Sequence, residues 1–170
     1  TIELESEENV GSTFTVTVPF EIDHLIENND LQKDSCPQSM DLSGKRVLLV
    51  EDNAINMEIA HAILEEEDLN ITEAKNGKEA LETFQNSKSN EYDFIIMDVM
   101  MPVMDGLEAT KAIRMLERED AKKIPIIAMT ANAFEEDRKA CLDAGMNEHI
   151  GKPIDIPLLK RTITKAIGDR

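Results

Sequence analysis

Short apolar runs alternate with segments of helical periodicity along most of the chain. The runs at residues 47–50, 94–97 and 124–129 lack polar alternation, which is typical of strands covered on both faces. Weaker strands are predicted at 70–74 and 148–151. Apolar residues recur at helical spacing between and after these strands, and the predicted helices lie near 55–63, 77–84, 106–116, 133–143 and 155–167.

Five strands that alternate with five helices predict an α/β fold, a doubly wound parallel sheet with helices on both faces. Pro125 lies near the start of its strand, where a missing N–H is tolerated. In such sheets, ligands bind outside the carboxyl ends of the strands. The residues that follow each strand are therefore the candidates for chemistry.

The first 43 residues differ from the rest of the chain. They hold ten acidic residues and one basic residue. Their one dense apolar pattern, at residues 14–18, alternates with period two and predicts a single strand that ends at Pro19. Residues 21–43 are rich in Asn, Asp and Ser, which predicts an acidic polar linker. We therefore divide the chain into residues 1–20, the linker 21–43 and a domain over 44–170.

Composition and charge narrow the classes of function. The chain has 35 acidic and 18 basic residues, a net charge of −17. This charge argues against a nucleic-acid partner, because phosphate contacts need clustered Lys and Arg. No apolar run approaches the ~20 residues of a membrane span. Two cysteines in 170 residues fit a reducing compartment. We expect a cytoplasmic chain without direct membrane contact.

Charged and hydroxyl side chains stand at the ends of four predicted strands. Glu51 and Asp52 follow the first strand, and Asp98 follows the third. Thr130 ends the fourth strand and Lys152 follows the fifth. On a parallel sheet these side chains converge, and three carboxylates need a cation such as Mg²⁺ to offset their repulsion. The set suits a phosphoryl group carried on Asp98, with Lys152 and Mg²⁺ offsetting its charge and Thr130 donating a hydrogen bond.

Each of these residues has a simpler explanation when it is taken alone. An acidic pair after a strand is commonly a solvated loop, and Asp98 could be a turn residue before Pro102. Thr130 could cap a helix, and Lys152 could be a surface lysine. Their joint occurrence at strand ends favours a site. The chain has neither a Gly-rich phosphate loop of the G-x-x-x-x-G-K-[ST] form nor a Ser–His–Asp set.

At these residues the chain resembles the receiver domain of two-component response regulators. The resemblance extends from Lys45 to Ile167. It rests on six motifs: residues 47–53 (VLLVEDN), 96–98 (IMD), 100–106 (MMPVMDG), 128–131 (AMTA), 145–147 (GMN) and 151–154 (GKPI). The resemblance implies a flavodoxin-like sheet with strand order 2-1-3-4-5.

The resemblance also implies roles for particular residues. They are the phosphoacceptor Asp98, the Mg²⁺ ligands Asp52, Asp98 and the backbone carbonyl of Met100, Glu51 supporting the metal through water, the switch hydroxyl Thr130 and the phosphate-pairing Lys152. His149 stands where the family often has Tyr or Phe, and we interpret it as a partly buried ring that fills space.

Residues 51–56 (EDNAIN) are similar to receivers of hybrid sensor histidine kinases. Residues 9–20 resemble the end of a kinase ATP-binding domain, although the usual extra glycine near Asn9 is lacking. The implied partners are a kinase phosphohistidine domain and a histidine phosphotransfer protein. Because the catalytic histidine segment and most of the ATP site are absent, we expect no kinase activity from this chain alone. The receiver would catalyse only its own phosphorylation and dephosphorylation.

Two other functions are considered. An aspartyl-phosphate phosphatase of the haloacid-dehalogenase type needs a second Asp two positions after the nucleophile, and Met100 stands there instead. A receiver used only for docking would act without phosphorylation, but all of the phosphorylation residues are present. Both are set below the hypothesis of a phosphorelay receiver, which takes a phosphoryl group from phosphohistidine onto Asp98 with Mg²⁺ and then passes it to a histidine phosphotransfer protein or switches conformation.

Overall fold

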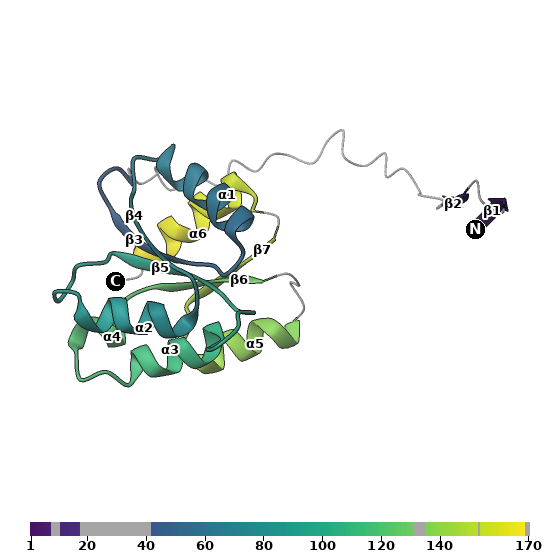
Figure 1. The fold of residues 1–170 in the computed structure, drawn as a ribbon. Coiled ribbons are helices and arrows are strands. Elements are labelled where there is room, and N and C mark those ends of the chain that lie inside the picture. The colour runs from purple at the N-terminus through teal and green to yellow at the C-terminus, as the bar shows by residue number, and fades with distance from the viewer. Residues whose placement is uncertain (8–10, 18–41, 131–134, 153, 169–170) are drawn as a thin grey trace, which may run out of the picture. The chain divides into compact units, whose positions relative to one another are not determined.

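The protein is described by a computed structural model that covers residues 1–7, 11–17, 42–130, 135–152 and 154–168. The chain divides into two compact units, Thr1–Gln38 and Ser39–Arg170, and each is described by itself (Figure 1). None of the helices in these described ranges combines the length and apolarity needed to cross a membrane.

The first unit contains an antiparallel hairpin of β1 (Ile2–Glu7) and β2 (Gly11–Val16). Two of the three cross-strand pairs on one face are apolar, because Ile2 faces Val16 and Leu4 faces Phe14, whereas the third pair is Ser6 and Ser12. The hairpin therefore has one largely apolar face, and its four apolar side chains stay exposed among the described residues.

Only one strand was predicted in this region, at residues 14–18. The observed strand β2 begins earlier, at Gly11, and ends at Val16. Its partner β1 was missed, although Ile2 and Leu4 alternate with glutamates in the pattern of a strand. The predicted linker lies outside the described residues except for Leu42 and Ser43. Leu42 is buried in the core of the second unit.

The second unit alternates strands and helices. In chain order these are β3 (Arg46–Val50), α1 (Ala54–Glu65), β4 (Asn70–Ala74), α2 (Gly77–Asn86), β5 (Phe94–Asp98), α3 (Gly106–Arg114), α4 (Glu119–Lys123), β6 (Ile126–Thr130), α5 (Glu135–Ala144), β7 (Glu148–Gly151) and α6 (Ile156–Gly168). The sheet order is β4-β3-β5-β6-β7, and every neighbouring pair is parallel. Counted within this unit, that is the predicted order 2-1-3-4-5, so the predicted fold is confirmed.

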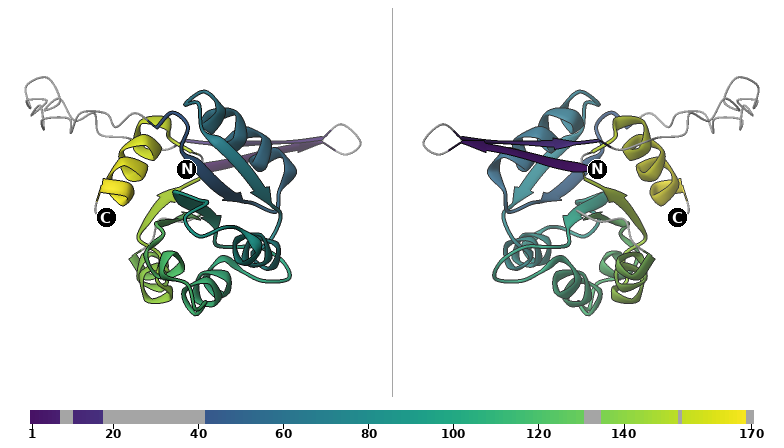
Figure 2. Two further views of the ribbon diagram at one scale, coloured as in Figure 1. Left: turned by 90° about the vertical axis from the view of Figure 1, so that its left-hand side faces the viewer. Right: turned by 90° about the vertical axis from the view of Figure 1, so that its right-hand side faces the viewer.

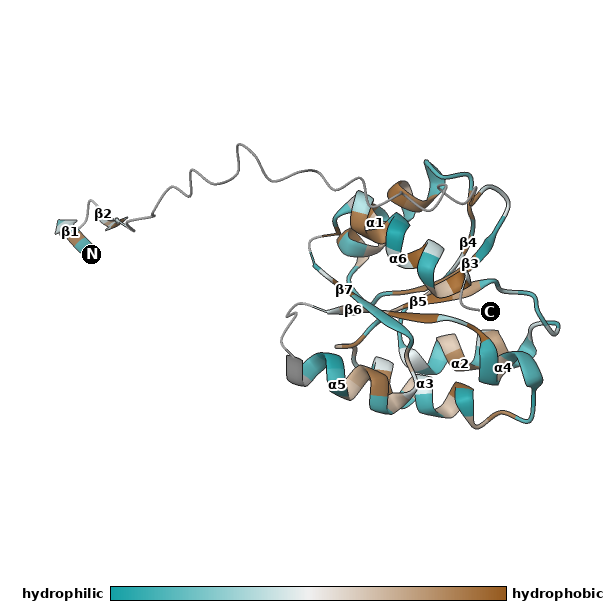
Figure 3. Ribbon diagram, turned by 180° about the vertical axis from the view of Figure 1, so that it is seen from behind, coloured by the Kyte–Doolittle hydropathy of each residue, from teal (hydrophilic) through white to brown (hydrophobic). Residues whose placement is uncertain are grey.

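Helices cover both faces of the sheet, with α1 and α6 on one side and α2, α3 and α5 on the other (Figures 1 and 2). Successive strand residues point to opposite faces. Val47 and Leu49 accordingly lie in the core beneath α1 and α6, whereas Leu48 and Val50 lie in the core beneath α2 and α3. In Figure 3 the central strands β3 and β5 are largely hydrophobic, and the helices on either side carry both hydrophobic and hydrophilic residues.

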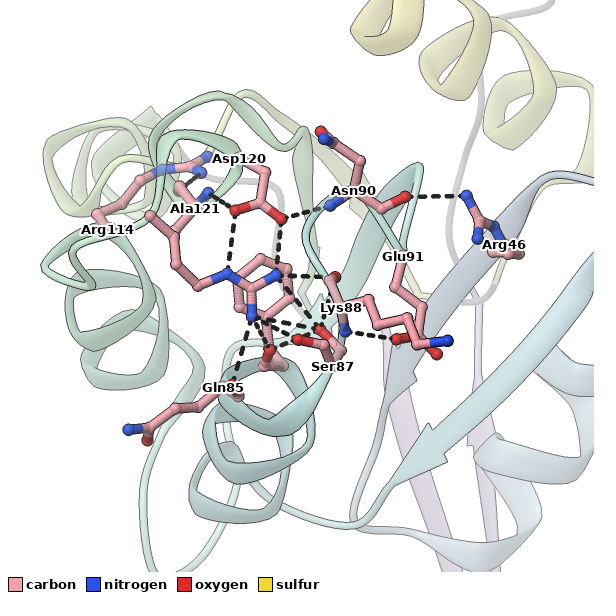
Figure 4. A network of polar contacts seen from close by, with 11 residues as sticks. Arg46, Gln85, Ser87, Lys88, Asn90, Glu91, Arg114, Asp120 and Ala121 are labelled. Carbon is pink, nitrogen blue, oxygen red and sulfur yellow. Dashed lines mark hydrogen bonds and ion pairs between the residues drawn. The ribbon is translucent and has the colours of Figure 1, made fainter.

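The short helix α4 was not predicted, and a polar network around it ties separate segments together (Figure 4). The Arg118 guanidinium donates hydrogen bonds to the carbonyls of Phe84 (2.7 Å), Ser87 (3.0 Å) and Lys88 (3.0 Å). It also pairs with the Asp120 carboxylate at 2.7 Å. The last carbonyls of a helix lack partners within the helix. Arg118 therefore satisfies the end of α2 and fixes the start of α4 against it.

Candidate functional site

The carboxyl ends of four strands meet at one edge of the sheet (Figure 1). Glu51 and Asp52 directly follow β3, and Asp98 is the last residue of β5. Thr130 ends β6, and its carbonyl accepts a hydrogen bond from the Lys152 amide (2.8 Å) just beyond β7. The parallel sheet thus brings the predicted residues to the same edge.

Three carboxylates form the acidic part of this site. Oxygen atoms of Glu51, Asp52 and Asp98 all lie within 4.8 Å of one another. Glu51 is 2% exposed and Asp98 is 4% exposed, whereas Asp52 is exposed. Oxygen donors of this kind are the ligands that Mg²⁺ prefers, and one or two carboxylates commonly bind it. The donor set therefore fits a divalent cation.

Lys152 bridges the two buried carboxylates. Its Nζ lies 2.8 Å from Asp98 Oδ2 and 2.6 Å from Glu51 Oε2. Burial raises the pKa of Asp98, against the lowering effect of its hydrogen bond with Lys152. For Lys152, burial lowers the pKa, but the hydrogen bonds to both carboxylates outweigh burial and raise it. The ammonium is therefore charged at neutral pH.

The β3–α1 turn sets the orientation of Glu51. Asn53 caps α1, because its Oδ1 accepts hydrogen bonds from the amides of Ile55 (2.9 Å) and Asn56 (3.2 Å). Asn56 Nδ2 in turn donates to Glu51 Oε1 at 2.9 Å. One oxygen of Glu51 thus faces Asn56 and the other faces Lys152. Asn56 was part of the EDNAIN motif, but no role was predicted for it.

The loop after β5 contacts the Asp98 side chain directly. The Met100 amide donates to Asp98 Oδ1 at 3.2 Å, so the two oxygens of Asp98 have different partners. The Met100 side chain is exposed. The role of its backbone carbonyl as a metal ligand stays a prediction.

Thr130 and His149 are placed by the neighbouring strands. Thr130 is buried, and the residue before it, Met129, pairs in register with Asp98. Its role as a switch hydroxyl stays a prediction. His149 pairs in register with Ala128 and is half-buried, which agrees with a ring that fills space.

The part of the chain that contains these site residues matches a known protein family. Residues 47–164 match the response regulator receiver domain, which covers more than half of the chain. The chain therefore belongs to the response regulator receiver domain family. The resemblance predicted from the strand-end motifs is confirmed.

Related sequences are hybrid histidine kinases. Hybrid signal transduction histidine kinase I of Dictyostelium discoideum is 41% identical over 125 residues, which is 72% of this chain and 7% of the relative. The aerobic respiration control sensor protein ArcB of Escherichia coli is 35% identical over 170 residues, which is 96% of this chain and 20% of the relative. The chain spans only a small part of these curated relatives. The predicted similarity to receivers of hybrid kinases is confirmed.

Solved structures agree in fold. The receiver domain of sensor histidine kinase PA1611 from Pseudomonas aeruginosa, with a magnesium ion in its active-site cleft, has a TM-score of 0.66 and 39% identity. The match covers 74% of this chain and 99% of that one. The receiver domain of Ssk1 from Saccharomyces cerevisiae, solved with the phosphotransfer protein Ypd1, has a TM-score of 0.65 and 32% identity. That match covers 72% of this chain and 88% of the other.

Proposed function

We propose that the chain is the receiver of a hybrid histidine kinase, and that it accepts a phosphoryl group from phosphohistidine onto Asp98. One observation carries this proposal: a buried carboxylate lies 2.8 Å from a lysine ammonium and beside two further carboxylates at the carboxyl edge of the sheet. An Asp98 oxygen attacks phosphorus, the P–N bond breaks, and the imidazole leaves with the electron pair of that bond. The product is an aspartyl phosphate.

The surrounding residues have separate roles in this proposal. Asp52, Asp98 and the Met100 carbonyl would hold Mg²⁺, and Glu51 would support the metal through water. Mg²⁺ held there would neutralise charge on the phosphoryl oxygens. Lys152 pairs with a phosphoryl oxygen in place of its present contact with Asp98. Thr130 donates a hydrogen bond to another phosphoryl oxygen and thereby biases the conformation of the last strands and helices.

The proposed donor and acceptor are proteins with a reactive histidine, namely a kinase phosphohistidine domain and a histidine phosphotransfer protein. The yeast Ssk1 receiver, which was solved with Ypd1, supports this class of partner. The surface beside the site supports it further. Ile55 and Ile59 are exposed on α1, and a small pocket of about 90 Å³ beside Ile59 is also lined by Lys152 and Ile154. An apolar surface beside Lys152, the partner of Asp98, suits a protein donor better than a small phosphate donor.

For the N-terminal unit, we propose that residues 1–20 are the end of a kinase ATP-binding domain, that 21–43 is a linker and that 44–170 is the receiver. The exposed apolar face of the β1–β2 hairpin supports this division, because an isolated two-stranded hairpin is marginal in water. The similarity to ArcB over 170 residues supports it as well. A cytoplasmic location belongs to the same proposal.

The test is phosphorylation by acetyl phosphate with Mg²⁺, followed by intact-mass measurement and peptide mapping. We expect one added phosphoryl group on Asp98, labile to hydroxylamine, and none in the Asp98→Asn variant. Asp155→Asn is the matched control, because that residue lies in the loop before α6 and its Oδ1 accepts a hydrogen bond from the Leu158 amide. Full labelling of Asp98→Asn at an acid-stable site would overturn the proposal.

A further inference from the structure

Two glycines approach the loop over residues 99–105, which joins Asp98 to α3. The Gly106 amide donates to the Val99 carbonyl at 3.0 Å. From another helix, the amide of Gly77 donates to the Met104 carbonyl, also at 3.0 Å. The loop is thus held near its start by the first residue of α3 and near its end by the first residue of α2.

Gly77 has no room for a side chain. A Cβ added there would lie 2.6 Å from the Met104 carbonyl oxygen, 2.9 Å from the Asp105 carbonyl oxygen and 2.8 Å from Ala109 Cβ. Two of these atoms are backbone and the third is fixed on α3, so none can rotate away. Because Asn76 caps α2 by accepting the Glu79 amide (2.9 Å), this end of the helix is itself held in place. Any larger residue at position 77 must push α2 and the loop apart.

The contact with Met104 holds a strained turn. Val103 has a φ of +72°, and the Met104 amide donates to the Pro102 carbonyl at 2.9 Å across it. A β-branched residue in this region of φ is an outlier, and such a backbone persists only when its surroundings fix it. Val103 is 80% exposed, so burial of its side chain does not fix the turn. The hydrogen bond from Gly77 acts on the very next residue.

The other end of the same loop orients the reacting group. The Met100 amide donates to Asp98 Oδ1 at 3.2 Å, so a displaced loop displaces the donor that sets the rotation of this carboxylate. We propose that Gly77 is a positioning residue for the Asp98 site. Because Gly77 has no side chain, its amide can come close enough to donate to the Met104 carbonyl. This hydrogen bond fixes the loop, and the loop in turn fixes the position of the Met100 amide. This inference rests on the proposed phosphorylation of Asp98.

The first test compares Gly77→Ala with Gly145→Ala in the full chain, with acetyl phosphate and Mg²⁺. A side chain at Gly145 would also be strained, because its φ is +99° and an added Cβ would lie 3.2 Å from Arg114 Cγ. Gly145 differs in that it precedes β7, at the opposite edge of the sheet from Asp98. We expect the first-order rate constant at saturating acetyl phosphate to fall at least about tenfold in Gly77→Ala, since small misplacements of reacting groups have effects of this size. The apparent KM should change less than twofold. Gly145→Ala should keep the rate of the parent chain.

A second measurement separates displacement from general loss of stability. In amide NMR spectra, Gly77→Ala should shift the resonances of residues 99–105, and Gly145→Ala should leave them in place. Asn76→Ala removes the helix cap without adding a Cβ at position 77, and we expect a two- to fivefold fall in rate with shifts in the same amides. If Gly77→Ala does not fold, Asn76→Ala decides the outcome.

The results that overturn the inference differ from those that overturn the proposed function. A rate in Gly77→Ala equal to that of the parent chain, or an equal fall in Gly145→Ala, removes the positioning role of Gly77. Unshifted amides at 99–105 in a folded Gly77→Ala protein do the same. Absence of any aspartyl phosphate in the parent chain instead removes the proposed function of Asp98.

Discussion

The Nζ of Lys152 lies 2.8 Å from Asp98 Oδ2, so the proposed phosphoacceptor is already paired with a cation of the chain itself. The same ammonium lies 2.6 Å from Glu51 Oε2. A divalent cation bound to Asp52 and Asp98 therefore meets Lys152 as a like charge at short range. The positive charge of Lys152 would stabilise a phosphoryl group bound to Asp98. Before that group arrives, the same charge repels a metal ion at the site.

The first prediction is that Lys152→Met binds Mg²⁺ about three- to tenfold more tightly than the parent chain, a difference of about 1 kcal/mol. Removing the ammonium removes its repulsion of the metal and leaves the three carboxylates uncompensated. Isothermal titration calorimetry with Mg²⁺ measures the dissociation constant. Lys160→Met is the control for loss of one charge, since Lys160 on α6 pairs instead with Glu67, in the turn after α1. Equal or weaker binding by Lys152→Met would contradict competition at the site.

The second prediction concerns the stability cost of Asp98. Burial raises the pKa of this carboxyl, so the unfolded chain ionises more readily than the folded one. The folded state therefore loses stability as pH rises through the raised pKa. At pH 7 we expect the free energy of unfolding of Asp98→Asn to exceed that of the parent chain by about 0.5–2 kcal/mol. The gain should shrink as pH falls from the raised pKa toward the ordinary Asp pKa of about 4.

Urea unfolding at pH 7 and pH 4 measures this difference. Glu82→Gln serves as the control, because Glu82 is an exposed carboxylate on α2 whose replacement should change stability by less than about 0.5 kcal/mol. A less stable Asp98→Asn protein at pH 7 would mean that the bond to Lys152 outweighs burial at this position.

Much of the site could be predicted from the sequence, because parallel strands place their carboxyl ends at one edge. That rule alone brought Glu51, Asp98 and Lys152 together from positions up to 101 residues apart. The hydrogen bond from Asn56 to Glu51 could not be predicted by that rule, because it depends on how the first turn of α1 is capped. The sequence marks Asn56 but does not say which atom it reaches.

Other features leave little trace in the sequence. Arg118 binds carbonyls of Phe84 and Lys88, and every residue has a carbonyl, so composition cannot single out these acceptors. Gly77 could be recognised as a helix start, but its contact with Met104 depends on how closely α2 and the loop pack. In β1 only Ile2 and Leu4 are apolar, alternating with Glu3 and Glu5, and so short an alternation was not recognised as a strand without its pairing with β2.

The third prediction concerns Asp120, which is 9% exposed and pairs with Arg118. The hydrogen bond from Arg118, helped by the Asn90 amide, lowers the pKa of this carboxyl from 3.8 to about 2. A lowered pKa contributes stability above the unfolded value, and that stability is lost as pH falls through the folded value. We expect Asp120→Asn to lose about 2 kcal/mol at pH 7, with the difference from the parent chain vanishing between about pH 4 and pH 2. Urea unfolding across this pH range measures it, and a difference that persists at pH 2 would contradict the assignment.

The last prediction tests the strain at Val103, whose φ is +72° in an exposed turn. A left-handed backbone costs a non-glycine residue about 1–2 kcal/mol, whereas glycine loses about 0.5–1 kcal/mol through the greater freedom of its unfolded chain. Val103→Gly should therefore raise the free energy of unfolding by about 0.5–1 kcal/mol, measured by thermal unfolding. Met100→Gly, in the same loop and also exposed but without a positive φ, should lower it. If both variants lose stability equally, the turn stores no strain, and the hydrogen bond from Gly77 to Met104 has no strained backbone to hold in place.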